Sequence, residues 1–236
     1  MAVAIVQARM SSKRLPGKVL MPILEKPMIS LLLERLTRAT LLSDIIVATS
    51  NDFTDDILAK EIKDLGFQVY RGSLSDVGSR YLEIIQERKI ETVVRITGDC
   101  PVVDHKLVDR IIHFYLDGNY HYASNTLTRT FPRGLDVEIF NASSYVEFSS
   151  DNKMSDYDKE HVTPIFYQNP RIFRLGNFMN DADFSSQRWT VDNAADFKFI
   201  SEVFENLYIA NPDFDFEDIC EFVQKNPLIS NFELDH

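Results

Sequence analysis

The stretch AVAIVQARMSSKRLPGKVL, residues 2–20, decides the fold class because it joins a short buried strand to a basic loop. Residues 2–8 contain no charged side chain, and their only polar one is Gln7, which is typical of a strand buried on both faces of a sheet. The loop that follows contains a Pro-Gly turn and carries four cations: Arg9, Lys13, Arg14 and Lys18. A buried strand that ends in such a loop predicts an α/β sheet with a ligand-binding loop at its edge.

Strands and helices alternate through the first half of the chain. Short apolar runs predict further strands at 44–50, 67–72 and 91–98. Amphipathic segments predict helices from Pro27 to about 39 and at 54–65, 75–89 and 105–117. This alternation predicts a doubly wound α/β fold, a mostly parallel sheet with helices on both faces and right-handed crossovers.

The second half of the chain has a looser pattern and a different composition. Of 17 Phe residues, only Phe53 and Phe67 precede residue 114. Extended segments are expected at 120–125, 135–140, 173–179 and 188–192, and helices near 142–150, 157–168, 194–208 and 215–225. No repeat or low-complexity linker separates the halves. We therefore expect a single domain, residues 1–236, whose aromatic-rich second half (119–236) elaborates the first (1–118).

Composition excludes several classes of function. The net charge of -11 argues against a general affinity for nucleic acid or anionic membranes. Only the first 24 residues are basic, with a charge of +4, so a small anionic ligand there is compatible with the acidic remainder. Cys100 and Cys220 provide neither a disulfide framework nor a zinc motif. No apolar run approaches a membrane span, and the start lacks the order of a secretory signal, so we expect a soluble cytoplasmic protein.

The expected topology brings the basic loop to an acid. In open α/β sheets, ligands bind beyond the carboxyl ends of the strands, where the strand order reverses. For the order 3-2-1-4 that point lies between the first and fourth strands, so loop 8–18 faces Asp99, which follows the fourth strand. Cations facing a carboxylate across a cleft indicate a metal-bound phosphate.

Two common phosphate motifs are excluded. A P-loop requires Gly where this chain has Ser12 and Ser or Thr where it has Val19. No GxGxxG follows any strand, which removes the simplest dinucleotide-binding interpretation. A basic loop of this size remains suited to nucleotidyl transfer, in which the charge of the leaving group must be held electrostatically.

Eight segments then occur in a recognisable order along the chain. They are IVQARMSSKRLPGKVL (5–20), KPMI (26–29), IIVATS (45–50), VYRGSLSDV (69–77), RITGDCPVVD (95–104), PRGLDVEIF (132–140), EHVTPIFY (160–167) and RWTVDNAADF (188–197). Together they resemble the cytidylyltransferases of acidic sugars, a family that includes the CMP-KDO and CMP-acylneuraminate synthetases. The pattern is most similar to the spore coat polysaccharide biosynthesis protein F branch.

The resemblance implies a nucleotide-diphospho-sugar transferase-like fold and a nucleotidyl transfer reaction. A hydroxyl of an acidic sugar would attack the α-phosphate of CTP, giving a CMP-sugar and pyrophosphate, with Mg²⁺ as cofactor, in surface or spore coat polysaccharide biosynthesis. By family position, the nucleotide-binding residues are Ala8, Arg9, Arg14, Lys18, Arg71, Ser73 and Arg80. Arg forks and a Lys point charge suit phosphate oxygens, and Lys13 is expected to be solvated. Relatives often carry an acid before the last of these arginines, where this chain has Ser79.

The resemblance also assigns the remaining roles. Asp99 and Asp192 correspond to the magnesium ligands and, with Arg14 and Lys18, form the catalytic set. Asp99 could instead terminate a strand, and Asp192 could cap the next helix, although Asn193 with Asp196 already forms a suitable cap. A homodimer is expected, through the second half. The sugar-binding candidates are Arg133, Asp136, Glu138 and His161.

Several alternatives remain open at this stage. Glu138 could be an outward residue on an alternating strand, and His161 could be structural. A nucleotide-sugar-dependent glycosyltransferase shares this type of fold, but its DxD motif is absent and GDC stands in its place. A non-catalytic subunit that binds CTP is the third interpretation.

Overall fold

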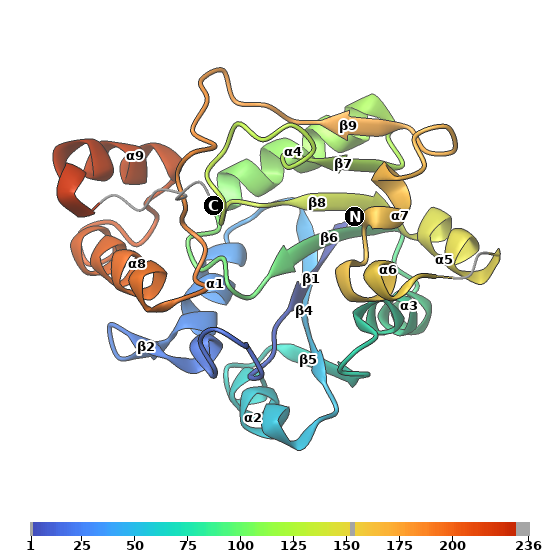
Figure 1. The fold of residues 1–236 in the computed structure, drawn as a ribbon, viewed down its shortest axis with the longest axis horizontal. Coiled ribbons are helices and arrows are strands. Elements are labelled where there is room, and N and C mark those ends of the chain that lie inside the picture. The colour runs from blue at the N-terminus through green and yellow to red at the C-terminus, as the bar shows by residue number, and fades with distance from the viewer. Residues whose placement is uncertain (1, 152–153, 230–236) are drawn as a thin grey trace.

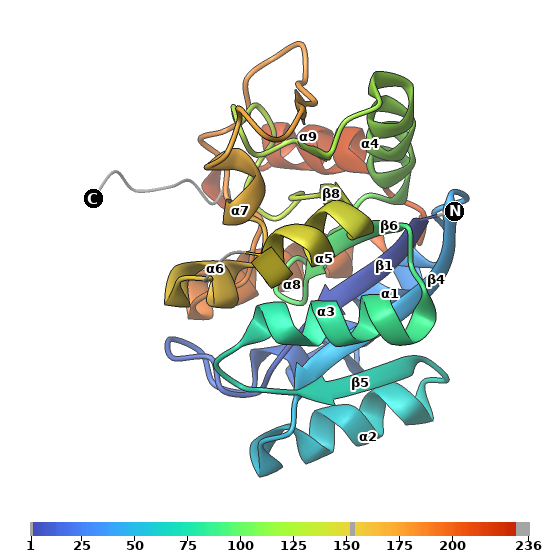
Figure 2. The ribbon, with the colours of Figure 1, turned by 90° about the vertical axis from the view of Figure 1, so that its right-hand side faces the viewer.

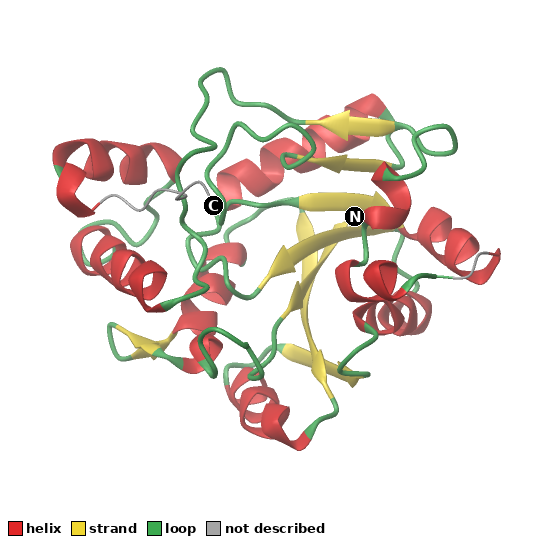
Figure 3. Cartoon of the chain, viewed as in Figure 1, coloured by secondary structure: helices red, strands yellow, loops and turns green. Residues whose placement is uncertain are grey.

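The computed structural model describes residues 2–151 and 154–229. Its centre is a seven-stranded sheet in the order β5-β4-β1-β6-β8-β7-β9 (Figures 1 and 3). The strands are β1 (Ala2–Gln7), β4 (Leu42–Ser50), β5 (Gln68–Gly72), β6 (Thr92–Thr97), β7 (Tyr122–Ser124), β8 (Glu138–Asn141) and β9 (Leu175–Asn177). The first four strands of this sheet to occur along the chain are parallel and have the predicted order 3-2-1-4. The doubly wound α/β prediction is confirmed.

The second half extends this sheet with an antiparallel strand. β8 runs antiparallel to both β6 and β7, and β9 then pairs parallel with β7. β8 therefore lies inside the sheet, between two neighbours, and its residues Glu138–Phe140 are buried. A small hairpin of β2 (Pro22–Ile23) and β3 (Lys26–Pro27), which was not predicted, precedes the first helix.

Helices cover both faces of the sheet (Figure 2). Successive residues of β1 point to opposite faces, so Ala4 and Val6 join one apolar core while Ile5 joins the other. The first core packs against α1 (Met28–Leu36), α2 (Asp56–Asp64), α4 (His105–Gly118), α8 (Ala194–Leu207) and α9 (Phe216–Lys225). The second packs against α3 (Val77–Arg88), α5 (Ala142–Asp151) and α7 (Pro164–Tyr167).

The expected elements of the second half differ from the observed ones at two places. The helix expected at 157–168 is split into α6 (Asp156–His161) and α7, because Val162 has φ 68° and ψ -59°, outside the helical region. The extended segment at 188–192 forms no strand, and its one ladder contact is the bridge between Arg133 and Arg188. Three short 3₁₀ helices, η1 (Lys18–Leu20), η2 (Phe53–Asp55) and η3 (Pro227–Ile229), complete the described elements.

The aromatic residues of the second half mainly fill the two cores. Phe131, Phe140 and Phe166 are fully buried, and the rings of Tyr122 and Phe166 stack 5.5 Å apart. No helix within 2–151 or 154–229 combines the length and the apolar character that a bilayer crossing requires.

Candidate active site

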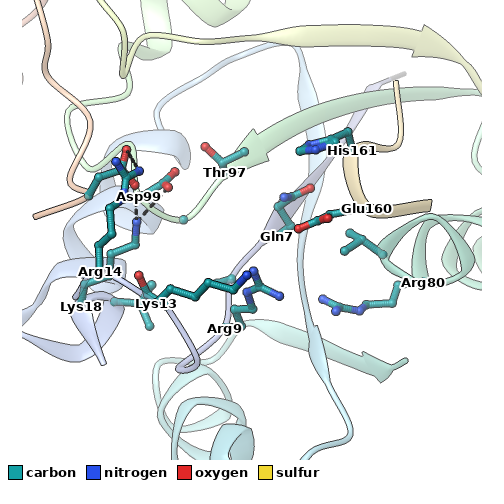
Figure 4. Close-up of a pocket in the computed structure, with 16 residues that line it drawn as sticks. Gln7, Arg9, Lys13, Arg14, Lys18, Arg80, Thr97, Asp99, Glu160 and His161 are labelled. Atoms are coloured by element: carbon teal, nitrogen blue, oxygen red, sulfur yellow. Dashed lines mark hydrogen bonds and ion pairs between the residues drawn. The ribbon is translucent and has the colours of Figure 1, made fainter. Parts of the chain in front are cut away.

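A cavity of about 390 Å³ opens at the carboxyl ends of β1 and β6, between the first and fourth strands of the predicted order (Figure 4). The structure thus brings the basic loop and Asp99 to one crevice, as the topology predicted. The lining residues are Gln7, Ala8, Arg9, Ser12, Lys13, Arg14, Lys18, Val19, Val77, Arg80, Thr97, Gly98, Asp99, Glu160, His161 and Asp192.

The basic loop closes on the carbonyl group of Met10. That oxygen accepts hydrogen bonds from the N–H groups of Ser12 and Gly17, both at 2.9 Å. Gly17 has φ 75°, a left-handed conformation that glycine adopts without strain, and it leads directly into η1. The turn thereby delivers Lys18 into the cavity wall with only 7% of its surface exposed.

Lys18 joins two acids that are far apart in the sequence. Its Nζ donates to Asp99 Oδ2 at 3.0 Å, to Asp192 Oδ1 at 3.1 Å and to the Val191 carbonyl at 2.6 Å. An ammonium group has three hydrogens, so its donors are fully used. Two carboxylate oxygens from different loops therefore converge on one cation.

Asp192 reaches this point because segment 188–192 packs closely against two other loops. The Val191 N–H donates to the Asp99 carbonyl at 2.8 Å, and the Trp189 N–H donates to the Arg133 carbonyl at 2.6 Å. A Cβ at Gly134 would lie 2.4 Å from the Trp189 carbonyl carbon, so only glycine permits this approach. Contacts among three loops, not a strand, fix the acid.

Three cations surround the Asp192 carboxylate. Besides Lys18, Arg14 lies at 2.9 Å, and Arg188 also forms an ion pair with it. Burial alone raises the pKa of Asp192, but Lys18, Arg14 and Arg188 outweigh burial and lower the pKa below its ordinary value. Asn193 and Asp196 form the capping box of α8, so the prediction that Asp192 is not needed as a cap is confirmed.

The three predicted nucleotide-binding residues outside the basic loop, Arg71, Ser73 and Arg80, are placed differently. Arg80 lines the cavity; it is 1% exposed and donates to the carbonyl groups of Ser73, at 2.6 Å, and Leu74. Ser73 starts the turn into α3, because its hydroxyl accepts from the Asp76 N–H. Arg71 lies outside the cavity lining and binds the Ser50 and Asp52 carbonyl groups and Asp56. The structure gives Ser73 and Arg71 no place in the lining, and their nucleotide roles stay predictions.

Sequence reasoning missed several lining residues. Gln7 accepts a hydrogen bond from Arg95 Nε at 3.0 Å. It is the only polar residue of β1, and a single polar residue in an otherwise apolar strand could have marked it as a functional candidate. Thr97 precedes Gly98 at the end of β6, and Glu160 precedes His161 at the end of α6. Lys13, which was expected to be solvated, is exposed but belongs to the lining.

A second cavity, of about 450 Å³, adjoins the first. It contains all four residues predicted to bind the sugar, and its lining is Arg95, Thr126, Leu127, Arg129, Arg133, Asp136, Glu138, Tyr157, His161, Thr163 and Tyr167. Among the described residues, His161 is the single one that lines both cavities. Its ring lies 4.3 Å from that of Tyr157.

Most charges in the second cavity are already paired. Glu138 is 8% exposed, forms an ion pair with Arg95, and accepts from the hydroxyl groups of Tyr122, at 2.7 Å, and Thr163, at 2.6 Å. The alternative in which Glu138 points outward to solvent is therefore wrong, because its carboxylate is buried among these three partners. Arg129 binds Asp136 through two nitrogens, at 2.5 and 2.9 Å.

The chain is similar to known proteins over nearly its whole length. The model of the family described as cytidylyltransferase matches residues 3–233. The spore coat polysaccharide biosynthesis protein SpsF of Bacillus subtilis is 31% identical over 231 residues, 94% of each chain. A 3-deoxy-manno-octulosonate cytidylyltransferase of Geobacter sulfurreducens is 35% identical over 111 residues, 46% of this chain and 43% of that protein. The structure of a cytidylyltransferase from Leptospira borgpetersenii superposes with a TM-score of 0.92 at 32% identity, covering 100% and 99% of the chains.

Proposed function

The chain belongs to the cytidylyltransferase family, and from this premise we propose that it transfers CMP from CTP to a hydroxyl group of an acidic sugar with the help of Mg²⁺. The observation that carries the proposal is the pair of adjoining cavities that meet at His161. One cavity has a basic loop facing two acids, which suits a nucleoside triphosphate. The other combines arginines with carboxylates, which suits an acidic, hydroxylated acceptor.

In the first cavity, the cationic side chains would hold the triphosphate. Arg9 and Arg14 offer forked donors for phosphate oxygens, and the Lys18 charge would offset the growing charge on the pyrophosphate leaving group. Because Lys18 now donates all its hydrogens to protein oxygens, a phosphate contact would require it to release one of them. This arrangement keeps the acids and the lysine together until nucleotide enters.

The residues present fit a magnesium ion. No group of three or more His, Cys, Asp or Glu side chains in 2–151 and 154–229 forms a metal site by itself. Asp99 and Asp192, however, place carboxylate oxygens within 3.1 Å of one cation, the Lys18 ammonium. Magnesium typically takes one or two carboxylates plus substrate phosphates, so these two residues would hold it. The ion would supply charge stabilisation at the α-phosphate.

The second cavity would select the acceptor. Arg133 can bind a carboxylate through paired hydrogen bonds. The Arg129–Asp136 and Arg95–Glu138 pairs would have to open before their members could bind the acceptor. The relatives named for spore coat polysaccharide and for 3-deoxy-manno-octulosonate support an acidic sugar destined for a polysaccharide. The proposal includes one domain whose halves, 1–118 and 119–236, serve the nucleotide and the sugar, acting as a cytoplasmic homodimer.

The test is pyrophosphate release. Each of the four nucleoside triphosphates would be incubated with Mg²⁺ and a panel of acidic sugars that includes KDO and acylneuraminates, with neutral hexoses as controls. Release that requires both CTP and one acidic sugar is the expected result. Binding of CTP without release from any pair would favour a non-catalytic subunit. Release with a neutral sugar alone would overturn the acidic acceptor.

A further inference from the structure

A buried carboxylate lies behind the basic loop and has no part in the proposed chemistry. Asp55 ends η2, is 0% exposed, and is 45 residues away from Met10 in the sequence. Its Oδ1 accepts from the Met10 N–H at 2.7 Å, and its Oδ2 accepts from the N–H of Ser50 at 3.0 Å and from the Ser50 hydroxyl. The carboxylate thus ties the loop after β1 to the end of β4.

The position of Asp55 in the chain would suggest a simpler role, which the structure does not support. Asp55 is the N-cap residue of α2, where an Asp side chain normally accepts from the first N–H groups of the helix. Here the side chain forms no such cap bond. The neighbouring Asp52 does act as a cap, for η2, through the Thr54 N–H at 2.9 Å. The Asp55 side chain therefore binds the basic loop and the end of β4, and it does not cap α2.

Met10 is the residue through which this contact reaches the cavity. Its N–H is held by Asp55, and its carbonyl group gathers the N–H groups of Ser12 and Gly17. The Met10 N–H is thus held by a residue outside the loop, and the Met10 carbonyl is held by residues within the loop. The loop between them carries Arg14 and ends at Lys18, so its anchorage determines where both cations lie.

We propose that Asp55 is a positioning residue for the nucleotide: by fixing Met10 it holds loop 9–18 in its phosphate-binding shape before the nucleotide enters. This inference rests on the proposed function only for the identity of the ligand. A loop that is already ordered loses less conformational entropy on binding, so loss of the anchor weakens binding without removing any group that contacts the nucleotide.

Asp55→Asn is the informative variant, because it preserves shape and replaces one acceptor oxygen with an NH₂ donor. Either the Met10 N–H or the Ser50 N–H then faces another donor. We expect the dissociation constant for CTP, measured by calorimetry, to rise about tenfold, or about 1.4 kcal/mol. The amides of Met10, Ser12 and Gly17 should exchange hydrogen faster than in the parent protein.

The chain offers a matched control in Asp109. Its carboxylate also accepts from two backbone N–H groups and one hydroxyl: the N–H of Thr40 at 2.8 Å, the hydroxyl of Thr40 at 2.8 Å and the N–H of Leu41 at 3.0 Å. It does not line the cavity. Asp109→Asn should leave both CTP binding and amide exchange in loop 9–18 unchanged. Because Asp55 is fully buried and Asp109 is only half-buried, CTP binding is compared well below the unfolding midpoint of each variant, where a change in stability alone leaves the dissociation constant unaltered.

A second variant and a second ligand make the test conclusive. If Asp55→Asn does not fold, Ser50→Ala removes one of the three bonds to the carboxylate and should raise the CTP dissociation constant about threefold. Tripolyphosphate serves as a second probe, so that failure to bind CTP, which would count against the proposed function, is distinguished from a failure of positioning. Unchanged amide exchange in loop 9–18, or unchanged binding of both probes, would overturn the role of Asp55.

Discussion

The two cavities contain the same types of charged residue but pair them differently. In the first cavity, Lys18 joins Asp99 and Asp192, whose side chains are 28% and 20% exposed. In the second cavity, the pair of Arg95 and Glu138 is only 11% and 10% exposed. The first set lies on loops beyond the ends of parallel strands, and the second lies within the sheet. Partly exposed pairs can exchange partners with a ligand, whereas a closed pair mainly holds structure.

Removing Asp99 or Asp192, the two partly exposed acids of the first cavity, tests this difference most strongly. Asp99→Asn or Asp192→Asn should reduce the rate of pyrophosphate release about a thousandfold, which corresponds to about 4 kcal/mol, because a metal-binding charge is lost. The thermal midpoint should change by only a few degrees, since these side chains are partly solvated. Measurement requires steady-state rates at saturating CTP together with thermal unfolding. Activity retained in either variant would contradict the metal site.

Removing Glu138 from its buried pair with Arg95 should have the opposite effect, a large loss of stability. Glu138→Ala leaves Arg95 buried without a counter-charge and leaves the hydroxyls of Tyr122 and Thr163 without their acceptor, so the free energy of unfolding should fall by about 3 kcal/mol. Urea unfolding measures this loss. Replacing both members, by Arg95→Met with Glu138→Leu, should recover only the part of the loss that is due to the unpaired charge, because the hydroxyls of Tyr122 and Thr163 still lack their acceptor. If the single variant is as stable as the parent, Glu138 is a free ligand-binding group after all.

The contrast between the cavities also explains what sequence could predict. The basic loop and Asp99 are each marked locally, by a strand that ends at charged or glycine residues, and the 3-2-1-4 order brings them together. Asp192 is different, because 174 residues separate it from Lys18 and it is held by loop contacts such as that at Gly134. Only the resemblance to a family pointed to it.

Other features depended on packing that no local pattern encodes. Alternation suggested an outward Glu138, but both faces of the sheet are covered at β8: Ile139 packs in one core, Phe140 packs in the other, and Glu138 is buried against Arg95. The helix break at Val162 is an exception, because a local signal was overlooked: Pro164 lies inside the expected helix and forms the first turn of α7. Asp55 falls inside the helix expected at 54–65, and only the structure shows that its carboxylate binds Met10.

Within the second cavity, an exposed arginine should matter for the acceptor and not for stability. Arg133 is exposed and lines the cavity, whereas Arg95 is enclosed. Arg133→Gln should raise the KM for the acidic sugar about tenfold, or about 1.4 kcal/mol, through loss of a charged hydrogen bond to its carboxylate. The KM for CTP and the urea midpoint should stay unchanged. An equal rise in both KM values would mean that Arg133 maintains the structure of the whole site and does not bind the sugar specifically.

The smallest expected effect concerns the turn between the two cavities. Val162 is 0% exposed, and the Thr163 N–H donates to the His161 carbonyl at 2.8 Å across it. With φ 68° and ψ -59°, this is a γ-turn of the rare strained type, centred on a β-branched residue. Strain of this kind persists only when neighbouring contacts impose it, and here the Thr163 hydroxyl is anchored on Glu138.

A pair of substitutions separates strain from packing at this turn. Val162→Ala and Val162→Gly both lose the buried side chain, but only glycine relieves the backbone. The glycine variant should therefore be about 1 kcal/mol more stable than the alanine variant, the reverse of the usual order. Val203 in α8 is equally buried and helical, so its glycine variant should be about 1 kcal/mol less stable than its alanine variant. If alanine is better at both positions, the turn is not strained, and His161 is not held between the cavities by an imposed backbone conformation.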